Sequence, residues 1–158
     1  MSIFNYKYAD RLISDLGYES THVMKVDRNR LPDFMSVDCT WFWKSQPNQI
    51  VDTTRVSPEN QVIGLVGAYP DDPFSLYGEM TVWIDGKKNV ISKSSLIFVP
   101  AGVPFGPVMI NKMEHPIFYC SMGVLADPKE KRDPNLPRYT IIDQTKEKHV
   151  NPPPPPDG

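Results

Sequence analysis

The chain has 158 residues, of which 40% are hydrophobic, 11% aromatic and 23% charged, as in a soluble globular protein of one domain. Its 17 basic and 19 acidic side chains give a net charge of −2. Without a Lys/Arg stripe, this charge argues against a nucleic-acid partner. No segment approaches the roughly 18 apolar residues of a membrane span, and the N-terminal residues lack the order of a signal peptide. We therefore expect a cytoplasmic protein with no membrane or nucleic-acid partner.

The N-terminal residues carry a helical pattern. Tyr8, Leu12, Ile13 and Leu16 recur at helical spacing, and Gly17 follows as a stop signal. The spacing predicts a short amphipathic helix over Tyr6–Leu16, within an N-terminal helix and arm that we assign to residues 1–37.

From Asp38 onward, short apolar or alternating segments are bounded by Gly, Pro and Asn. This pattern is typical of an antiparallel sandwich or barrel. We predict strands at Asp38–Lys44, Gln61–Gly67, Glu79–Ile84, Asn89–Ile91, Ser95–Val99, Val108–Asn111, Pro116–Val124 and Tyr139–Ile142. The dipeptide Asp85-Gly86 predicts a two-residue hairpin turn. The segment Tyr69–Phe74, with prolines at 70 and 73, predicts a loop.

The C-terminal residues form a separate segment. Five consecutive prolines, Pro152 to Pro156, predict an exposed polyproline II tail over residues 146–158, either disordered or a ligand for an aromatic groove. The two cysteines, Cys39 and Cys120, lie in apolar runs. We expect reduced core thiols, with a disulfide as the alternative.

The middle of the chain resembles the cupin family. Pro100-x-Gly102-x2-Phe105-x3-Met109 resembles the second cupin motif, P-x-G-x2-H-x3-N. Upstream, Arg55-x-Ser57-x3-Gln61 lies where the first motif would place H-x-H-x3-E. The resemblance covers roughly residues 38–124 and implies an all-β, cupin-type double-stranded β-helix, a jelly-roll barrel that we assign to residues 38–145. It also implies a homodimer, for which the aromatic segment Cys39–Trp43 is a candidate contact.

The resemblance places the four metal-ligand positions at Arg55, Ser57, Gln61 and Phe105. Guanidinium has no lone pair to offer, Phe has no ligating atom, and hydroxyl and amide groups are poor ligands alone. The three histidines, His22, His115 and His149, lie elsewhere in the sequence, where we expect them to be solvated. We therefore expect no metal and no cofactor.

An arginine in place of a metal ion keeps the site positive. We hypothesise that Arg55 clamps a carboxylate or similar anion while Ser57 and Gln61 supply neutral hydrogen bonds. The alternative is that Arg55 points into solvent. If Phe105 faces inward, Met109 shares its side of the strand, and Trp83 is a further candidate for a flat apolar wall. The alternative for these side chains is a core or an oligomer contact.

Two side chains are weak catalytic candidates. Glu79 begins an apolar strand, where partial burial would favour a general base, and Tyr119 could donate a proton. Three functions stay open. The first is a metal-independent protein that binds a small anionic or aromatic molecule in the barrel. The second is an enzyme, an isomerase, lyase, cyclase or metal-dependent oxygenase, acting on a small carboxylate or aromatic substrate. The third is a structural protein with a filled barrel.

Overall fold

Strands dominate the computed structural model, which describes residues 12–13, 17–27, 35–127 and 129–146. The elements are β1 (Leu12–Ile13), β2 (Tyr18–Val26), β3 (Ser36–Ser45), β4 (Gln49–Asp52), β5 (Glu59–Gly67), β6 (Ser75–Ile84), β7 (Lys87–Lys93), β8 (Ser95–Val99), β9 (Phe105–Met113), β10 (Ile117–Leu125), β11 (Thr140–Asp143) and the 3-10 helix η1 (Gln144–Lys146). No helix among these described residues is long and apolar enough to cross a membrane.

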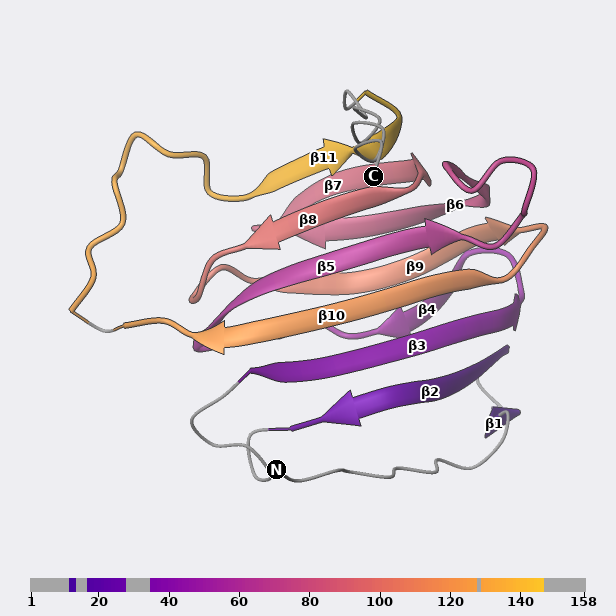
Figure 1. Cartoon of the computed structure of the whole chain (residues 1–158), viewed down its shortest axis with the longest axis horizontal. Helices are drawn as coiled ribbons and strands as arrows, with labels where there is room; N and C mark the ends of the chain where they lie inside the picture. Colours follow the sequence, from indigo (N-terminus) through magenta and orange to yellow (C-terminus); the bar gives the residue numbers. More distant parts are fainter. Residues whose placement is uncertain (1–11, 14–16, 28–34, 128, 147–158) are drawn as a thin grey trace, which may run out of the picture.

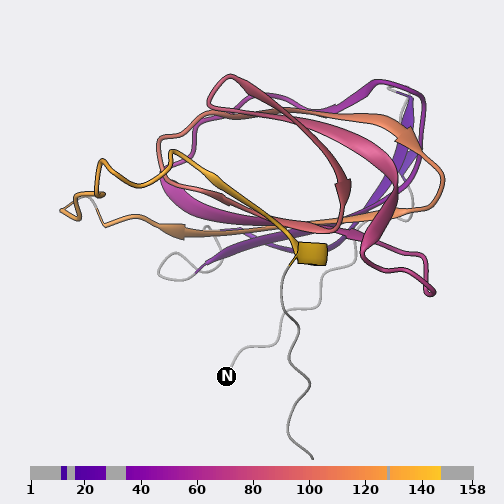
Figure 2. The ribbon, with the colours of Figure 1, turned by 90° about the horizontal axis from the view of Figure 1, so that it is seen from above.

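The strands form two antiparallel sheets. One has seven strands in the order β1-β2-β3-β10-β5-β8-β11, and the other has four in the order β4-β9-β6-β7 (Figure 1). Seen from above, the two sheets face each other and curve into a flattened barrel (Figure 2). Strands that are distant in sequence lie side by side, since β10 pairs with both β3 and β5. The all-β jelly-roll architecture expected from the sequence is confirmed.

The N-terminal segment differs from the expectation. Leu12–Ile13 is a strand paired with β2, so the predicted helix over Tyr6–Leu16 does not extend through these two residues, and its other positions lie outside the described residues. Tyr18–Val26, expected within an arm, is a nine-residue strand paired with β3. At the other end, β11 joins the large sheet beside β8. Most of the proline-rich tail, residues 147–158, lies outside the described residues.

The predicted turn at Asp85-Gly86 is confirmed as the hairpin between β6 and β7. Ile84 pairs with Lys87 across it. Both turn residues have positive φ, 53° for Asp85 and 75° for Gly86, as a type I′ turn requires. Arg138 donates from Nε to Asp85 at 3.2 Å and braces the turn from outside.

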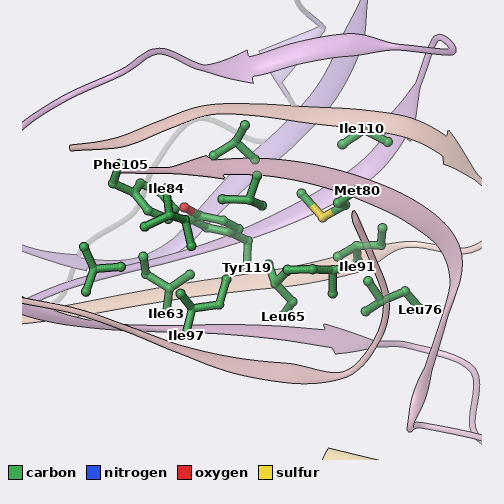
Figure 3. Packing of buried hydrophobic residues seen from close by; sticks show 14 of the residues in the cluster. Ile63, Leu65, Leu76, Met80, Ile84, Ile91, Ile97, Phe105, Ile110 and Tyr119 are labelled. Carbon is green, nitrogen blue, oxygen red and sulfur yellow. The ribbon is translucent and has the colours of Figure 1, made fainter. Parts of the chain in front are cut away.

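Alternating apolar side chains of both sheets fill the space between them. The alternating residues Met80, Val82 and Ile84 of β6 are fully buried. Figure 3 shows Met80 and Ile84 packed against residues of the large sheet such as Ile63 and Leu65. Core burial of this kind stabilises a fold by about 25 cal/mol per Å² of apolar surface.

In strand β9 the side chains do not alternate as we expected from the sequence. Phe105 faces the core, but so do Val108 and Ile110, all at most 1% exposed, so the alternation changes phase between positions 105 and 108. The pairing of β9 with β6 has an irregularity at the same place, where Ile84 is opposite Phe105 and Val82 opposite Val108. Met109 therefore does not share the side of Phe105.

The outer face of the large sheet carries stacked aromatic rings. Trp41 and Trp43 stack with centroids 5.4 Å apart, and Phe118 lies 4.8 Å from Trp41. Trp43 donates from Nε1 to Thr21 Oγ1 at 2.9 Å. We name Trp41, Trp43 and Phe118 the outer aromatic cluster. Trp41 and Trp43 of this cluster belong to Cys39–Trp43, the segment that we expect to contact a second copy of the chain. The homodimer itself stays a prediction.

Candidate functional site

A cavity of about 260 Å³ lies between the sheets where β2, β3 and β10 face β4 and β9. We call it the interior pocket. Its lining combines apolar walls with hydroxyl, imidazole, carboxylate and guanidinium groups: Tyr18, Ser20, His22, Asp38, Thr40, Phe42, Val51, Asp52, Arg55, Val108, Tyr119 and Ser121. Most of these lining groups are polar, and the pocket has a smaller apolar part at Phe42, Val51 and Val108.

One wall of the interior pocket carries an imidazole–carboxylate pair. His22 Nδ1 lies 2.8 Å from Asp38 Oδ1 and 3.0 Å from Thr40 Oγ1. Thr40 donates its hydroxyl to the same carboxylate oxygen at 3.3 Å. A carboxylate at this distance orients the imidazole ring. His22 therefore has a carboxylate partner that the sequence did not predict, while 33% of its side chain stays exposed.

Tyr119 supplies a buried hydroxyl without a partner. The residue is 7% exposed, and its hydroxyl oxygen is one of the few buried side-chain atoms of the described residues that has no hydrogen-bond partner. Figure 3 shows its ring between the sheets, near Phe105 and Ile84. Burial raises the pKa of Tyr119 well above its usual range; Asp52 and Asp38 act in the same direction, and Arg55 opposes them. The phenol therefore stays protonated and can donate a hydrogen bond.

The β-sheet register aligns the polar groups of this wall. Thr40 is directly opposite Tyr119 on one side and opposite His22 on the other. Neighbouring strands lie about 4.8 Å apart, so these three residues form one row across β2, β3 and β10. All three line the interior pocket.

Arg55 lies at the mouth of the pocket, with 47% of its side chain exposed. Its backbone is fixed by two hydrogen bonds to Phe105, one in each direction, at 2.8 and 2.9 Å. Arg55 Nη2 lies 3.4 Å from Asp52 Oδ2, while Asp52 Oδ1 accepts the Thr53 N–H at 2.9 Å. The backbone of Arg55 is thus fixed, while about half of its side chain is exposed.

Only two of the sequence-predicted site residues, Arg55 and Tyr119, line the interior pocket. Ser57 accepts the Glu59 N–H at 3.0 Å instead of lining the interior pocket. Gln61 lines a second, wider hollow of about 650 Å³ formed by residues of β5, β8 and β10 and by residues 126–127 and 130–136. Phe105 is 1% exposed and belongs to the hydrophobic core.

The other three predicted residues lie on the small sheet, away from the interior pocket. Because Met80 and Val82 point into the core, Glu79 and Trp83 alternate to the outer face of β6. Met109 occupies the outer face of β9, between the inward Val108 and Ile110. Glu79 Oε2 accepts a hydrogen bond from Asn111 Nδ2 at 2.8 Å, outside the lining of the pocket.

The residues at the cupin metal positions do not fit a divalent ion. The positions hold a guanidinium, a hydroxyl, an amide and a phenyl ring, and the phenyl ring is packed in the core. Among the described residues no three His, Cys, Asp or Glu side chains gather closely enough to hold an ion. We therefore assign no metal ligand to these four positions.

Comparison with solved structures finds proteins of similar fold. An RmlC-like cupin from Shewanella frigidimarina is 14% identical with a TM-score of 0.48, covering 81% of this chain and 95% of its own. KdgF from Halomonas sp. is 12% identical with a TM-score of 0.46, covering 76% and 89%. The polyketide cyclase RemF from Streptomyces resistomycificus is 12% identical with a TM-score of 0.45, covering 81% and 82%.

At these identities the likeness concerns the fold alone. No family model and no curated protein matches the amino-acid sequence. The two facing antiparallel sheets of the chain, with a polar pocket between them, agree with the jelly-roll architecture that its sequence predicts.

Proposed function

We propose that this protein binds a small carboxylate or a similar anion in the interior pocket without the help of a metal. The observation that carries the proposal is the buried Tyr119 hydroxyl, which has no partner in a pocket that Arg55 borders. A buried donor without an acceptor costs about 1–3 kcal/mol, and a ligand acceptor would remove this cost.

The contacts that the charged side chains of the pocket already make indicate which charge a ligand should carry. Both carboxylates of the pocket already have partners. Asp38 contacts His22 and Thr40, and Asp52 contacts Arg55 and the Thr53 N–H. Arg55 contacts Asp52 through Nη2 alone, and a guanidinium carries five N–H groups, so Arg55 keeps further donors with which to hold a carboxylate. A ligand should therefore supply acceptors, as the anion hypothesis from the sequence requires.

The size of the pocket limits the ligand. A volume of about 260 Å³ equals about nine water molecules at roughly 30 Å³ each. It lies just below the usual range for drug-sized ligands, about 300–1,000 Å³. The apolar walls Phe42, Val51 and Val108 favour a body of one ring or a short chain. A filled barrel, the structural alternative, is not supported by a cavity of this size.

A comparison of charged and neutral ligands tests the proposal. We expect acetate and benzoate to raise the melting temperature, while acetamide and benzamide leave it unchanged. Arg55→Ala and Tyr119→Phe should each weaken binding by about tenfold or more, equal to about 1.4 kcal/mol. Arg138→Ala is the matched control, since this arginine pairs with Asp85 outside the pocket. Equal stabilisation by acids and amides, or full binding by Arg55→Ala, would contradict the proposal.

A second candidate function is proton transfer on the bound molecule, the enzyme alternative. It is favoured by the pairing of His22 with Asp38 in the same row as Tyr119. An oriented imidazole is suited to act as a base, and a protonated phenol to donate a hydrogen bond to an oxygen that becomes negative. The test is exchange of the methyl protons of pyruvate in D₂O, followed by NMR. Exchange that is lost in His22→Ala but kept in Arg138→Ala supports an enzyme, and absence of exchange leaves binding alone.

A further inference from the structure

Cys39 and Cys120 face each other on the outer side of the large sheet. They are directly opposite in the register of β3 and β10, and their Sγ atoms lie 2.9 Å apart. Both are free thiols. They alternate with Thr40 and Tyr119, which point into the interior pocket, so the thiols lie on the reverse side of the pocket wall.

The positions of the two residues permit a disulfide. Directly opposite residues of an antiparallel pair have Cα atoms about 4.5–5.5 Å apart. Disulfides span Cα separations of about 4.4–6.8 Å, so the backbone need not move far. To reach the S–S bond length of about 2.05 Å, the sulfur atoms must approach by only about 0.9 Å.

We propose that Cys39 and Cys120 form an oxidative modification site, in which a small disulfide such as oxidised glutathione converts the two thiols to an intrachain disulfide. In the first step one thiolate attacks glutathione disulfide, forming a mixed disulfide and releasing one glutathione thiolate, which takes up the proton. In the second step the other thiolate attacks the mixed disulfide and releases the second glutathione. Two protein thiols are oxidised, and one glutathione disulfide is reduced to two glutathione molecules.

The exposure of the two thiols determines which of them reacts first. Cys120 is partly exposed, and its neighbour on β5 in the register is Gly64, which has no side chain to cover it. Cys39 is 2% exposed. Burial raises the pKa of Cys39 to about 12, with added contributions from the hydrogen bond and the charge of Cys120. Cys120 therefore reacts first. The mixed disulfide then removes both contributions of the Cys120 thiol, so the pKa of Cys39 falls while its burial persists, and Cys39 completes the bond in a slower second step.

The disulfide would act on the interior pocket from behind. Each cysteine lies between two residues that line the pocket: Asp38 and Thr40 around Cys39, and Tyr119 and Ser121 around Cys120. Joining the two strands at this point fixes their spacing beneath the row of Thr40 and Tyr119. We expect oxidation to change the environment of the Tyr119 phenol, and this part rests on the pocket of the proposed function.

Intact mass and thiol counts of the full-length protein test the modification. After treatment of the reduced, native protein with oxidised glutathione, we expect a monomer that is lighter by two hydrogen atoms and has no reactive thiol. Cys39→Ser should stop at one glutathione adduct on Cys120, whereas Cys120→Ser should react at least tenfold more slowly because Cys39 is buried. An unmodified native protein, stable adducts on both cysteines, or a disulfide between two chains would each overturn the proposal.

A second readout tests the coupling to the pocket without any ligand. In NMR spectra of protein labelled at its tyrosine rings, the Tyr119 signal is the one lost in Tyr119→Phe. We expect this signal to move on oxidation of the wild type and to stay in place in the Cys39→Ser, Cys120→Ser double variant. If the disulfide forms and the signal does not move, the coupling is wrong while the modification stands. Failure of carboxylate binding affects neither readout, so the two proposals fail separately.

Discussion

Gly67, the last residue of β5, lies against the backbone of Ser75, the first residue of β6. A Cβ atom built on Gly67 would stand 1.9 Å from the Ser75 carbonyl oxygen. The Ser94 hydroxyl holds the same corner, since it accepts the Gly67 N–H at 3.2 Å and donates to the Pro73 carbonyl at 2.7 Å. Because the obstacle is backbone, a side chain at position 67 must force the two strands apart.

We predict that Gly67→Ala lowers the free energy of unfolding by about 3 kcal/mol or more. Gly64→Ala, in the same strand, is the control, because its Cβ would meet nothing closer than 3.8 Å. Its effect should stay within about 1 kcal/mol. Urea unfolding of both variants measures the difference in the free energy of unfolding. Equal losses for the two variants would show that the strands at this corner move apart easily.

Tyr119→Phe should separate stability from binding. The substitution removes a buried hydroxyl that has no partner and leaves the ring in the core, so we expect the free energy of unfolding to rise by about 1 kcal/mol. The same variant should bind acetate and benzoate less tightly. Urea unfolding checks the first effect. A fall in stability would mean that the hydroxyl is satisfied in solution.

The pKa of Cys39 predicts an alkaline limit to stability. Its value is raised from 9.0 to about 12 by burial, with further contributions from Cys120 and Asp38. A raised pKa means that the folded state holds the proton more tightly, so this stabilisation is complete below pH 9 and is lost as pH rises from 9 to 12. In this window we expect Cys39→Ser to lose stability less steeply than the wild type, by up to about 1.4 kcal/mol per pH unit.

This measurement requires a reductant throughout, so that no disulfide replaces the thiols. Parallel slopes for the wild type and Cys39→Ser between about pH 9 and 12 would contradict the prediction. Below about pH 8 the two proteins should show the same pH dependence.

The outer aromatic cluster predicts a homodimer contact. Val66 pairs with Phe118 in the register of the large sheet and is 41% exposed. If two copies join through this face, Val66→Lys places a charge at the contact and should weaken the dimer by about 100-fold. Val90→Lys, at a position 54% exposed on the other sheet, is the control. Sedimentation velocity distinguishes the cases, and a monomeric wild type at micromolar concentration would rule the contact out.

The sequence predicted best where local chemistry determines structure. Asp85 and Gly86 specify their hairpin because both tolerate positive φ, and the alternation of Met80, Val82 and Ile84 specifies a buried face. The phase of β9 was not predictable in this way. Its alternation changes between Phe105 and Val108, and only the pairing with β6 shows the irregularity.

Part of the candidate site could be predicted from the sequence, and part could not. Arg55 and Tyr119 were found from the motif position and the residue type. His22 was missed because β2 carries no apolar alternation: its inward residues Ser20 and His22 are polar, as a pocket wall requires. Asp38 lies in a predicted strand, within β3, but was missed as a site residue because its partner His22 was. The pairing of β2 also shifts twice, once between His22 and Met24. A strand that lines a polar pocket thus loses the pattern by which strands are recognised.

The place of β10 in the large sheet has a consequence for synthesis of the protein. This strand fills the space between β3 and β5, and its own residues, Ile117–Leu125, come late in the chain. Until they leave the ribosome, β3 and β5 each present an unpaired edge, and such edges invite association with other nascent chains. The arrival of β10 therefore both completes the pocket and ends the period in which the chain is most prone to aggregate.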